Sequence, residues 1–279
     1  MRGRGPWNDP VLARSTPEGT HRMDRLPLLD PTAAPFADDF TAGSPDPGRW
    51  VDHYLPHWTT PDRSRARCAP TPGGLELRIE ADQPDWRPED APLRVSNLQT
   101  ATFSGPAGST RGTHRHRPDG LTVRTPTPTR LLWAPREGQV DVRVTASLDR
   151  GCMLAVWLVG TEHESPGDSG EVCVCEIDAD AVGETSTRVR TGVKAHHDPR
   201  LRTEVTEVVV PVGAGQAHWW SARWNASGVV VACDERVVFT SAQHVRGPQQ
   251  LMVDLFEVVA PGPAGEYPKT AVVHAVRGS

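Results

Sequence analysis

Proline and glycine interrupt this chain so often that a long helix has little room to form. The sequence contains 27 prolines and 25 glycines among 279 residues. Both residues break helices, and both are favoured in tight turns. The sequence therefore favours many short strands joined by turns. The length is compatible with a single large all-β domain.

Strand-like runs recur between these turn residues, and many of them alternate apolar with polar side chains. In residues 139–147, for example, every second position from Val140 to Val144 is a valine. Such alternation is typical of a strand with one face on a core and the other toward solvent or a cleft. We expect strands at 75–82, 95–103, 139–147, 153–160, 171–177, 204–212, 218–224, 229–234, 236–240, 250–258 and 270–276. The predicted fold is an all-β, antiparallel two-sheet β-sandwich.

Two features of the pattern set the expected domain organisation. Residues 1–35 are polar and proline-rich, which predicts a disordered N-terminal tail before one domain over residues 36–279. The longest interruptions between the expected strands are 43–73, 83–94 and 104–137. Loops of that length in a compact domain are commonly functional, so we expect them to form the rim of a cleft.

Charge and composition exclude several classes of function. The formal net charge is −5 and both signs are interspersed, which argues against a nucleic-acid partner. No window resembles a membrane span, and no hydrophobic signal core is seen at the N-terminus. The five cysteines are an odd number, which argues against a complete disulfide framework. These observations predict a cytoplasmic location and no membrane partner. They do not set the oligomeric state.

The segment 171-EVCVCE-176 carries two glutamates in a run that otherwise indicates a strand. Side chains on a regular strand alternate between its faces, so Glu171 and Glu176 are expected on opposite sides. One β-bulge between positions 174 and 176 would reset the alternation and bring both carboxylates to the same face. Bulges are common beside active sites because they redirect side chains in this way.

Two carboxyl groups about 5–5.5 Å apart are the machinery of a retaining glycosidase. One ionised carboxylate attacks the anomeric carbon, and the other donates a proton to the leaving oxygen and then activates water. By pattern alone, two acids in a strand are more often solvent-facing residues. The spacing is therefore compatible with a glycosidase but is not sufficient to identify one.

The segment resembles the catalytic strand of glycoside hydrolase family 16, the laminarinase and lichenase family. The motif of that family is Glu–apolar–Asp–apolar–apolar–Glu, and this chain carries Cys173 at its acidic middle position. Further similar segments, in the expected order, are 36–40, 46–50, 138–144, 155–160, 218–238 and 268–277. The resemblance implies a concanavalin A-like jelly roll that acts on a β-linked oligosaccharide or a glycosylated metabolite. It also implies a retaining hydrolase or transglycosylase, with Glu171 as nucleophile and Glu176 as general acid/base.

Cys173 is the main departure from the family pattern. A thiol has a pKa near about 8.5, so it is mostly neutral and a weak hydrogen-bond partner at neutral pH. We expect this change to lower the pKa of the general acid and to loosen the geometry of the site, although the two glutamates alone still define the chemistry. Two alternatives therefore stay open: acid/base chemistry on a non-carbohydrate metabolite, and a carbohydrate-binding module without turnover.

Aromatic and polar residues elsewhere are candidates for binding a carbohydrate or a glycosylated small molecule. Aromatic rings pack on the apolar C–H faces of sugars. The expected substrate-binding residues are Tyr54, His57, Trp58, Trp133, Trp157 and Glu257. The histidine pairs His114/His116 and His196/His197 are expected at the surface. Because a single Cys-x-Cys is poor evidence for zinc, we expect no metal and no cofactor.

Overall fold

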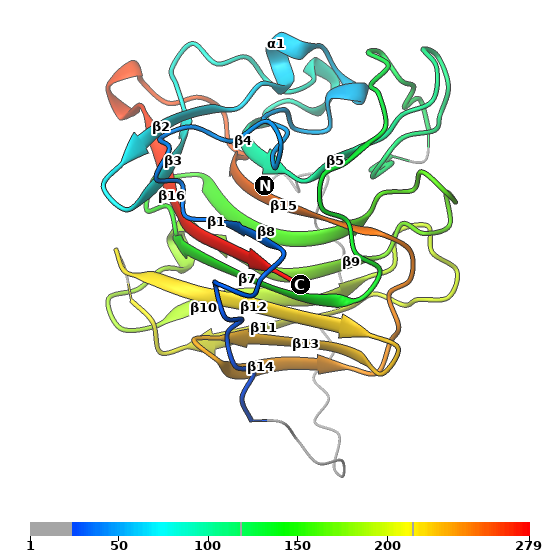
Figure 1. The fold of residues 1–279 in the computed structure, drawn as a ribbon. Helices are drawn as coiled ribbons and strands as arrows, with labels where there is room; N and C mark the ends of the chain where they lie inside the picture. The colour runs from blue at the N-terminus through cyan, green and yellow to red at the C-terminus, as the bar shows by residue number, and fades with distance from the viewer. Residues whose placement is uncertain (1–23, 118, 214) are drawn as a thin grey trace.

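The computed structural model describes residues 24–117, 119–213 and 215–279, and they form two antiparallel sheets packed face to face (Figure 1). The all-β sandwich expected from the sequence is confirmed. One sheet has the order β14 (Arg236–Ser241), β13 (Gly228–Cys233), β12 (Ala217–Asn225), β7 (Gly138–Thr145), β16 (Lys269–Gly278), β3 (Gly74–Ile79), β2 (Arg67–Thr71), with β1 (Phe36–Asp38) also on β16. The other has the order β11 (Glu204–Val210), β10 (Thr187–Lys194), β9 (Glu171–Asp178), β8 (Cys152–Gly160), β15 (Gln249–Glu257), β4 (Arg94–Gln99).

The remaining elements are short and lie in the connections. A two-stranded sheet joins β5 (Ala101–Thr102) to β6 (Arg130–Leu131). The helical turns are α1 (Pro61–Ser64), η1 (Pro56–Trp58), η2 (Pro88–Asp90), η3 (Ala179–Ala181) and η4 (Ala264–Glu266). None of the helices in the described part of the chain is long and apolar enough to cross a membrane.

All eleven expected strands are present, with shifts of a few residues at their ends. The expected hairpin between β13 and β14 is also present, and Asp234 and Glu235 at its turn both have positive φ angles, 47° and 65°. Two such residues match the twist of antiparallel strands across a tight turn. The strand β1 lies in the segment 36–40 that resembles the entry strand of the family, whereas β2, β6 and β10 were not expected from the sequence. Of these, β10 matters most because it lies beside β9.

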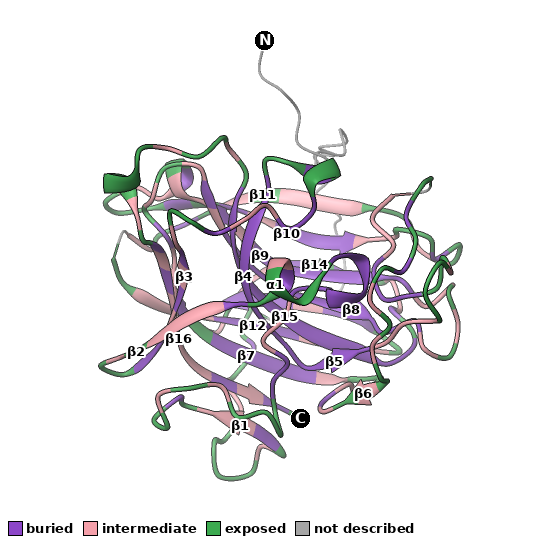
Figure 2. Ribbon diagram, turned by 90° about the horizontal axis from the view of Figure 1, so that it is seen from above, coloured by how far each residue is buried: buried purple, intermediate pink, exposed green. Residues whose placement is uncertain are grey.

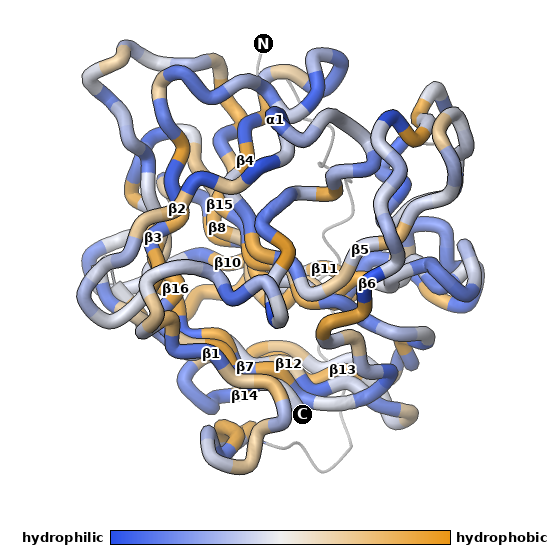
Figure 3. Tube along the Cα trace, turned by 45° about the horizontal axis from the view of Figure 1, so that its top comes forward, coloured by the Kyte–Doolittle hydropathy of each residue, from blue (hydrophilic) through white to orange (hydrophobic). Residues whose placement is uncertain are grey.

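The strand β8 shows how the second sheet is buried on both faces. Leu154, Val156 and Leu158 point into the main core between the sheets. Ala155 and Trp157 point the other way, into a second apolar cluster with residues from the long loops. Figure 2 shows buried residues along the strands of both sheets, and Figure 3 shows the hydrophobic segments concentrated there. The long loops thus cover part of the outer face of this sheet.

Trp133 lies in the main core, which corrects its expected place in the binding cleft. Its ring stacks on Phe36 at a centroid distance of 5.3 Å and meets Trp224 edge to face at 6.1 Å. Gly278 leaves the room for this indole, since a Cβ there would lie 2.5 Å from the Trp133 ring. The long 104–137 loop therefore ends with an anchor between the sheets.

Residues 24–35 belong to the segment expected to be a tail, and they lie along the first sheet. Leu26 is fully buried, and its amide donates to the Glu235 carbonyl at 2.7 Å. The Leu29 amide donates to the Asp141 carboxylate at 2.6 Å. The first 23 residues of the expected tail lie outside the described residues.

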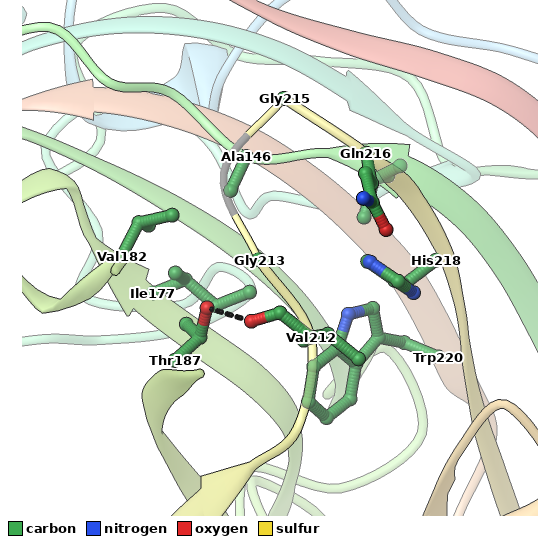
Figure 4. Close-up of a pocket in the computed structure, with 11 residues that line it drawn as sticks. Ala146, Ile177, Val182, Thr187, Val212, Gly213, Gly215, Gln216, His218 and Trp220 are labelled. Atoms are coloured by element: carbon green, nitrogen blue, oxygen red, sulfur yellow. Dashed lines mark hydrogen bonds between the residues drawn. The ribbon is translucent and has the colours of Figure 1, made fainter. Parts of the chain in front are cut away.

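A small cavity lies between the two sheets near the start of β10 (Figure 4). Trp220 of the first sheet and Ile177 of the second lie among its lining residues. The Thr187 hydroxyl beside it donates to the Val212 carbonyl at 2.8 Å. Its volume of about 20 Å³ has room for a water molecule at most, so it is no site for a sugar.

Trp133→Ala should lower the free energy of unfolding by about 3–5 kcal/mol, because it removes a buried aromatic ring and leaves a cavity. Urea denaturation measures this change. Leu131→Ala is the matched control, because Leu131 is 44% exposed and should change stability by less than about 0.5 kcal/mol. A Trp133 variant no less stable than the Leu131 variant would contradict this placement.

Candidate active site

A bulge in β9 sets the direction of the two glutamate side chains. Trp157 of β8 pairs with Cys173, whereas its neighbour Val156 pairs with Cys175, so Val174 is the extra residue. The pairing with β10 shifts over the same stretch. Val174 and Cys175 consequently both lie in the main core, although they are adjacent in the chain. The predicted bulge is thus confirmed, and it reverses the alternation in the middle of the strand.

Beyond the bulge, Glu176 faces the same side of the sheet as Glu171. A carboxylate oxygen of each, together with the Cys173 sulfur, lies within 4.8 Å of the other two atoms. Both glutamates line a cavity of about 300 Å³ on the outer face of the second sheet. Its lining residues are Tyr54, His114, Met153, Ala155, Trp157, Glu171, Glu176, Asp178, Arg190, Lys194, Phe256, Val258 and Val259. Unlike the small cavity between the sheets, this one has room for a sugar ring.

Two cations from β10 reach over the acid pair. Lys194 Nζ lies 2.9 Å from Glu171 Oε1 and 2.5 Å from Glu176 Oε1. Arg190 Nε donates to Glu176 Oε2 at 3.0 Å, and its other end contacts the Asp178 carboxylate. Neither residue was expected at the site, because the sequence did not indicate β10 as a strand.

Glu171 is held as an ionised carboxylate. His196 Nε2 donates to Glu171 Oε2 at 2.6 Å, while Lys194 binds the other oxygen. Burial by itself would raise the pKa of Glu171, but Lys194 and His196 together hold this pKa well below its ordinary value. A buried carboxylate that stays ionised at all ordinary pH values suits a nucleophile.

The pKa of Glu176 is also lowered. Burial raises this pKa, but the charges of Lys194 and Arg190 outweigh that effect, and the nearby Glu171 carboxylate offsets them only partly. Glu176 is therefore ionised at neutral pH in the absence of substrate. A general acid must carry its proton, so this residue requires either an acidic medium or a change in its contact with the cations.

Cys173 lies between the two glutamates and is fully buried. Its thiol donates to the Arg190 carbonyl at 3.6 Å, and burial raises its pKa well above the usual value. The thiol is therefore neutral and points toward the backbone of β10. The positive groups on β10, rather than residue 173, make the polar contacts to the acid pair.

One wall of the cavity is aromatic. Trp157 and Tyr54 line it, as expected from the sequence, and both are almost fully buried. The Trp157 indole donates to Asp254 Oδ2 at 2.6 Å, which fixes the orientation of the ring. Burial raises the pKa of Asp254 well above its usual range, which favours the neutral form of this carboxyl. The wall therefore offers a rigid apolar surface beside Glu171.

His57 and Trp58 are not among the lining residues of this cavity, which corrects their expected role in substrate binding. Both are fully buried beneath the loops. His57 Nε2 and Trp58 Nε1 each donate to the Thr113 carbonyl at 2.9 Å. They fix the segment that carries His114 into the cavity. Of this aromatic segment, Tyr54 lines the cavity, whereas Trp58 belongs to the second core.

Glu257 was also expected to bind substrate, but it is not among the lining residues of the cavity. Phe256 lines the cavity, so the next residue of β15 points to the opposite face. There Glu257 is fully buried, pairs with Arg94 and Lys269, and accepts a hydrogen bond from the Tyr267 hydroxyl at 3.0 Å. Glu257 therefore belongs to a buried ion cluster away from the acid pair.

Three residues at the rim have backbone conformations that side chains rarely adopt. His114, Glu162 and His196 have φ angles of 53°, 57° and 47°. The His114 amide donates to the Glu162 carboxylate at 2.6 Å, and the rings of His114 and His196 meet edge to face at 4.8 Å. Such conformations cluster at functional sites. His114 was expected at the surface, but it is buried.

His114, Glu171 and His196 also place one potential ligand atom each within 4.8 Å of the others. Two histidines and a glutamate are ligands that zinc accepts. However, Lys194 Nζ already lies 2.9 Å from the Glu171 carboxylate, so a divalent cation would meet an existing positive charge. These side chains therefore fit a metal ion poorly.

The sequence matches no protein-family model and no curated protein. The fold is similar to that of a Clostridium perfringens endo-β-galactosidase that releases GlcNAcα1-4Gal, with a TM-score of 0.71 and 19% identity over 88% of this chain. This chain spans 62% of the length of that protein.

Two glucanases share the fold over nearly their whole length. The laminarinase catalytic domain from Thermotoga petrophila has a TM-score of 0.60 and 13% identity, with coverage of 88% of this chain and 96% of that one. A non-specific endo-β-1,3(4)-glucanase of family GH16 has a TM-score of 0.61 and 16% identity, with coverage of 91% and 94%. The chain thus has the glycoside hydrolase family 16 fold, as the sequence resemblance implied.

The buried carboxyl group of Glu162 should make stability depend on pH. Burial raises the pKa of Glu162 to about 8. Between the unfolded value near about 4.3 and this value, the folded protein retains a proton that the unfolded chain has lost. The free energy of unfolding should therefore fall with rising pH, by at most about 1.4 kcal/mol per pH unit from this residue.

Glu162→Gln should flatten that dependence, because glutamine keeps an oxygen acceptor for His114 and does not ionise. Urea denaturation at several pH values between 4.5 and 8 measures the slope for wild type and variant. Glu164→Gln is the control, since Glu164 pairs with Arg136 at the surface. Equal slopes for wild type and the Glu162 variant would contradict the assignment.

Proposed function

We propose that this protein is a retaining β-glycoside hydrolase or transglycosylase, with Glu171 as nucleophile and Glu176 as general acid/base. One observation carries the proposal: oxygens of both carboxylates lie within 4.8 Å on one face of β9, in a cavity of about 300 Å³. Retaining enzymes hold their two carboxyl groups about 5–5.5 Å apart, whereas inverting enzymes leave room for a water molecule.

In the first half of the reaction, an oxygen of Glu171 attacks the anomeric carbon of the sugar. The bond from that carbon to the leaving oxygen breaks, and Glu176 gives its proton to the oxygen. His196 and Lys194 hold Glu171 ionised and oriented for this attack. The products of this half are a glycosyl ester on Glu171 and the released alcohol.

In the second half, Glu176 is a carboxylate and accepts a proton from water. The oxygen of that water attacks the anomeric carbon, and the ester bond to Glu171 breaks. If the hydroxyl of another sugar occupies the position of the water, the same step is a transglycosylation. Net configuration is retained because the carbon is inverted twice.

The cavity supports a carbohydrate or a glycosylated small molecule as substrate. Trp157 and Tyr54 provide an apolar wall on which the C–H face of a sugar ring can pack. Beside this wall, the charged groups of β9 and β10 provide hydrogen-bond partners for hydroxyl groups. An apolar wall with a few polar groups is the usual composition of a ligand pocket.

A second candidate function is carbohydrate binding without turnover. The observation that favours it is the pairing of Lys194 with both carboxylates, which keeps Glu176 ionised at neutral pH. A binding protein would show saturable binding of oligosaccharides and no hydrolysis at any pH. The two candidates therefore differ in turnover under acidic conditions.

Variants of the two glutamates test the proposal on β-1,3 and β-1,4 oligosaccharides and on aryl β-glycosides. Glu171→Gln should abolish turnover of all of them, because no group remains to form the ester. Glu176→Gln should lower kcat/KM about 10²–10⁴-fold on oligosaccharides, but much less on a dinitrophenyl glycoside, because kcat/KM reports the first half-reaction and this leaving group needs no proton. Glu207→Gln on β11 is the matched control and should keep wild-type activity. Hydrolysis unaffected by both substitutions would refute the proposal.

A further inference from the structure

One ammonium group contacts both members of the acid pair. Lys194 Nζ lies 2.9 Å from Glu171 and 2.5 Å from Glu176, and the side chain is partly buried in the cavity wall. Lys194 pairs across the sheet with Glu171, and Arg190 pairs with Glu176. Both cations therefore come from one strand whose register with β9 is fixed by backbone hydrogen bonds.

The residue of β10 midway between these two cations is a glycine. Gly192 pairs with Cys173, so no β10 side chain stands between Lys194 and Arg190. The Cys173 thiol donates a hydrogen bond to the backbone of β10 and is neutral. Lys194 is therefore the group that connects the two carboxylates across the middle of the motif.

We propose that Lys194 is a positioning residue that holds both carboxylates at neutral pH, and that protonation of Glu176 breaks its contact with Lys194. When both carboxylates are ionised, the ammonium group is shared between them. When Glu176 gains a proton, it loses its ion pairs with Lys194 and Arg190, and Lys194 stays with Glu171 alone. Only this second state provides both an ionised nucleophile and a protonated acid. The catalytic part of this inference rests on the function proposed above.

The charges around the acid pair determine the direction of the pH dependence. The titratable and charged groups that face it are Glu171, Cys173, Glu176 and Asp178 of β9, Arg190 and Lys194 of β10, His114 and His196 of the rim, Tyr54 of the loops and Asp254 of β15. Lys194 and Arg190 lower the pKa of Glu176, whereas Glu171 raises it.

The activity should fall as the pH rises. Because Glu176 must be protonated in the first half-reaction, the rate of that half falls as pH rises through its pKa. With that pKa below the ordinary value of about 4.3, wild-type activity should be confined to acidic pH. Removal of the Lys194 charge leaves two carboxylates close together with one cation fewer, so the pKa of Glu176 should rise by about 1–3 units.

The experiment is a carbon-13 NMR titration of the glutamate side-chain carboxyl carbons in the full-length protein. The Glu176 signal is assigned by its loss in Glu176→Gln. Wild type, Lys194→Met, Lys194→Arg and Arg188→Met are compared. Lys194→Arg keeps the charge. Arg188→Met removes a cation from the same strand, where Arg188 faces Glu207 of β11 instead of the acid pair.

The inference predicts a Glu176 pKa below the ordinary value in wild type, Lys194→Arg and Arg188→Met, and a clearly higher one in Lys194→Met. An unchanged pKa in Lys194→Met would overturn it. A wild-type Glu176 that titrates at or above the ordinary glutamate value would also overturn it, and this result does not depend on the folding of the Lys194 variants.

The pH–rate profile on an unsubstituted phenyl β-glycoside, whose leaving group needs a proton from Glu176, separates this inference from the proposed function. The alkaline limb of kcat/KM should move to higher pH in Lys194→Met by the shift seen in the titration, and should stay in place in Arg188→Met. If the titrations follow the prediction but Glu171→Gln does not lower turnover, the glycosidase proposal fails and the charge coupling stands. If Glu171→Gln abolishes turnover but the alkaline limb does not move, the Lys194 inference fails and the glycosidase proposal stands.

Discussion

The one-residue bulge in β9 is the constraint on which the site depends. Without the extra residue, Glu176 would point into the core between the sheets, where an ionised carboxylate costs several kcal/mol or more. With it, Val174 and Cys175 fill that core side by side, and both glutamates reach the outer face. The same local change therefore satisfies the packing of the sandwich and creates the acid pair.

Placing two acids together creates a second requirement, which β10 meets. Two carboxylates within 4.8 Å repel each other in a buried setting unless positive charge compensates them. Lys194 and Arg190 provide that charge, and His196 adds a hydrogen bond to Glu171. This compensation stabilises the resting site but keeps Glu176 ionised. The contacts that stabilise the resting site thus disfavour the protonated form of Glu176, which acid catalysis requires.

The sequence was informative where a short segment determines its own geometry. The spacing of Glu171 and Glu176 required a bulge if both were to share a face, and the structure has one. The sequence was misleading where the same residue type suits two environments: Trp58 and Trp133 are as suitable for a core as for a cleft. The cations on β10 were missed because only the pairing of distant strands brings Lys194 to Glu171. Residues 187–194 of β10 do alternate in the way that indicates a strand. This signal was weaker than that of the longer, more apolar runs elsewhere in the chain.

The most direct test of the central claim is covalent trapping of the nucleophile. The protein is incubated at acidic pH with 2-deoxy-2-fluoro β-glycosides that carry a dinitrophenyl leaving group, and peptide mass spectrometry locates the added sugar. A retaining mechanism at this bulged strand predicts one fluoroglycosyl group, attached to the carboxylate of Glu171. A label on another residue, or no label with a sugar that the protein hydrolyses, would contradict the account.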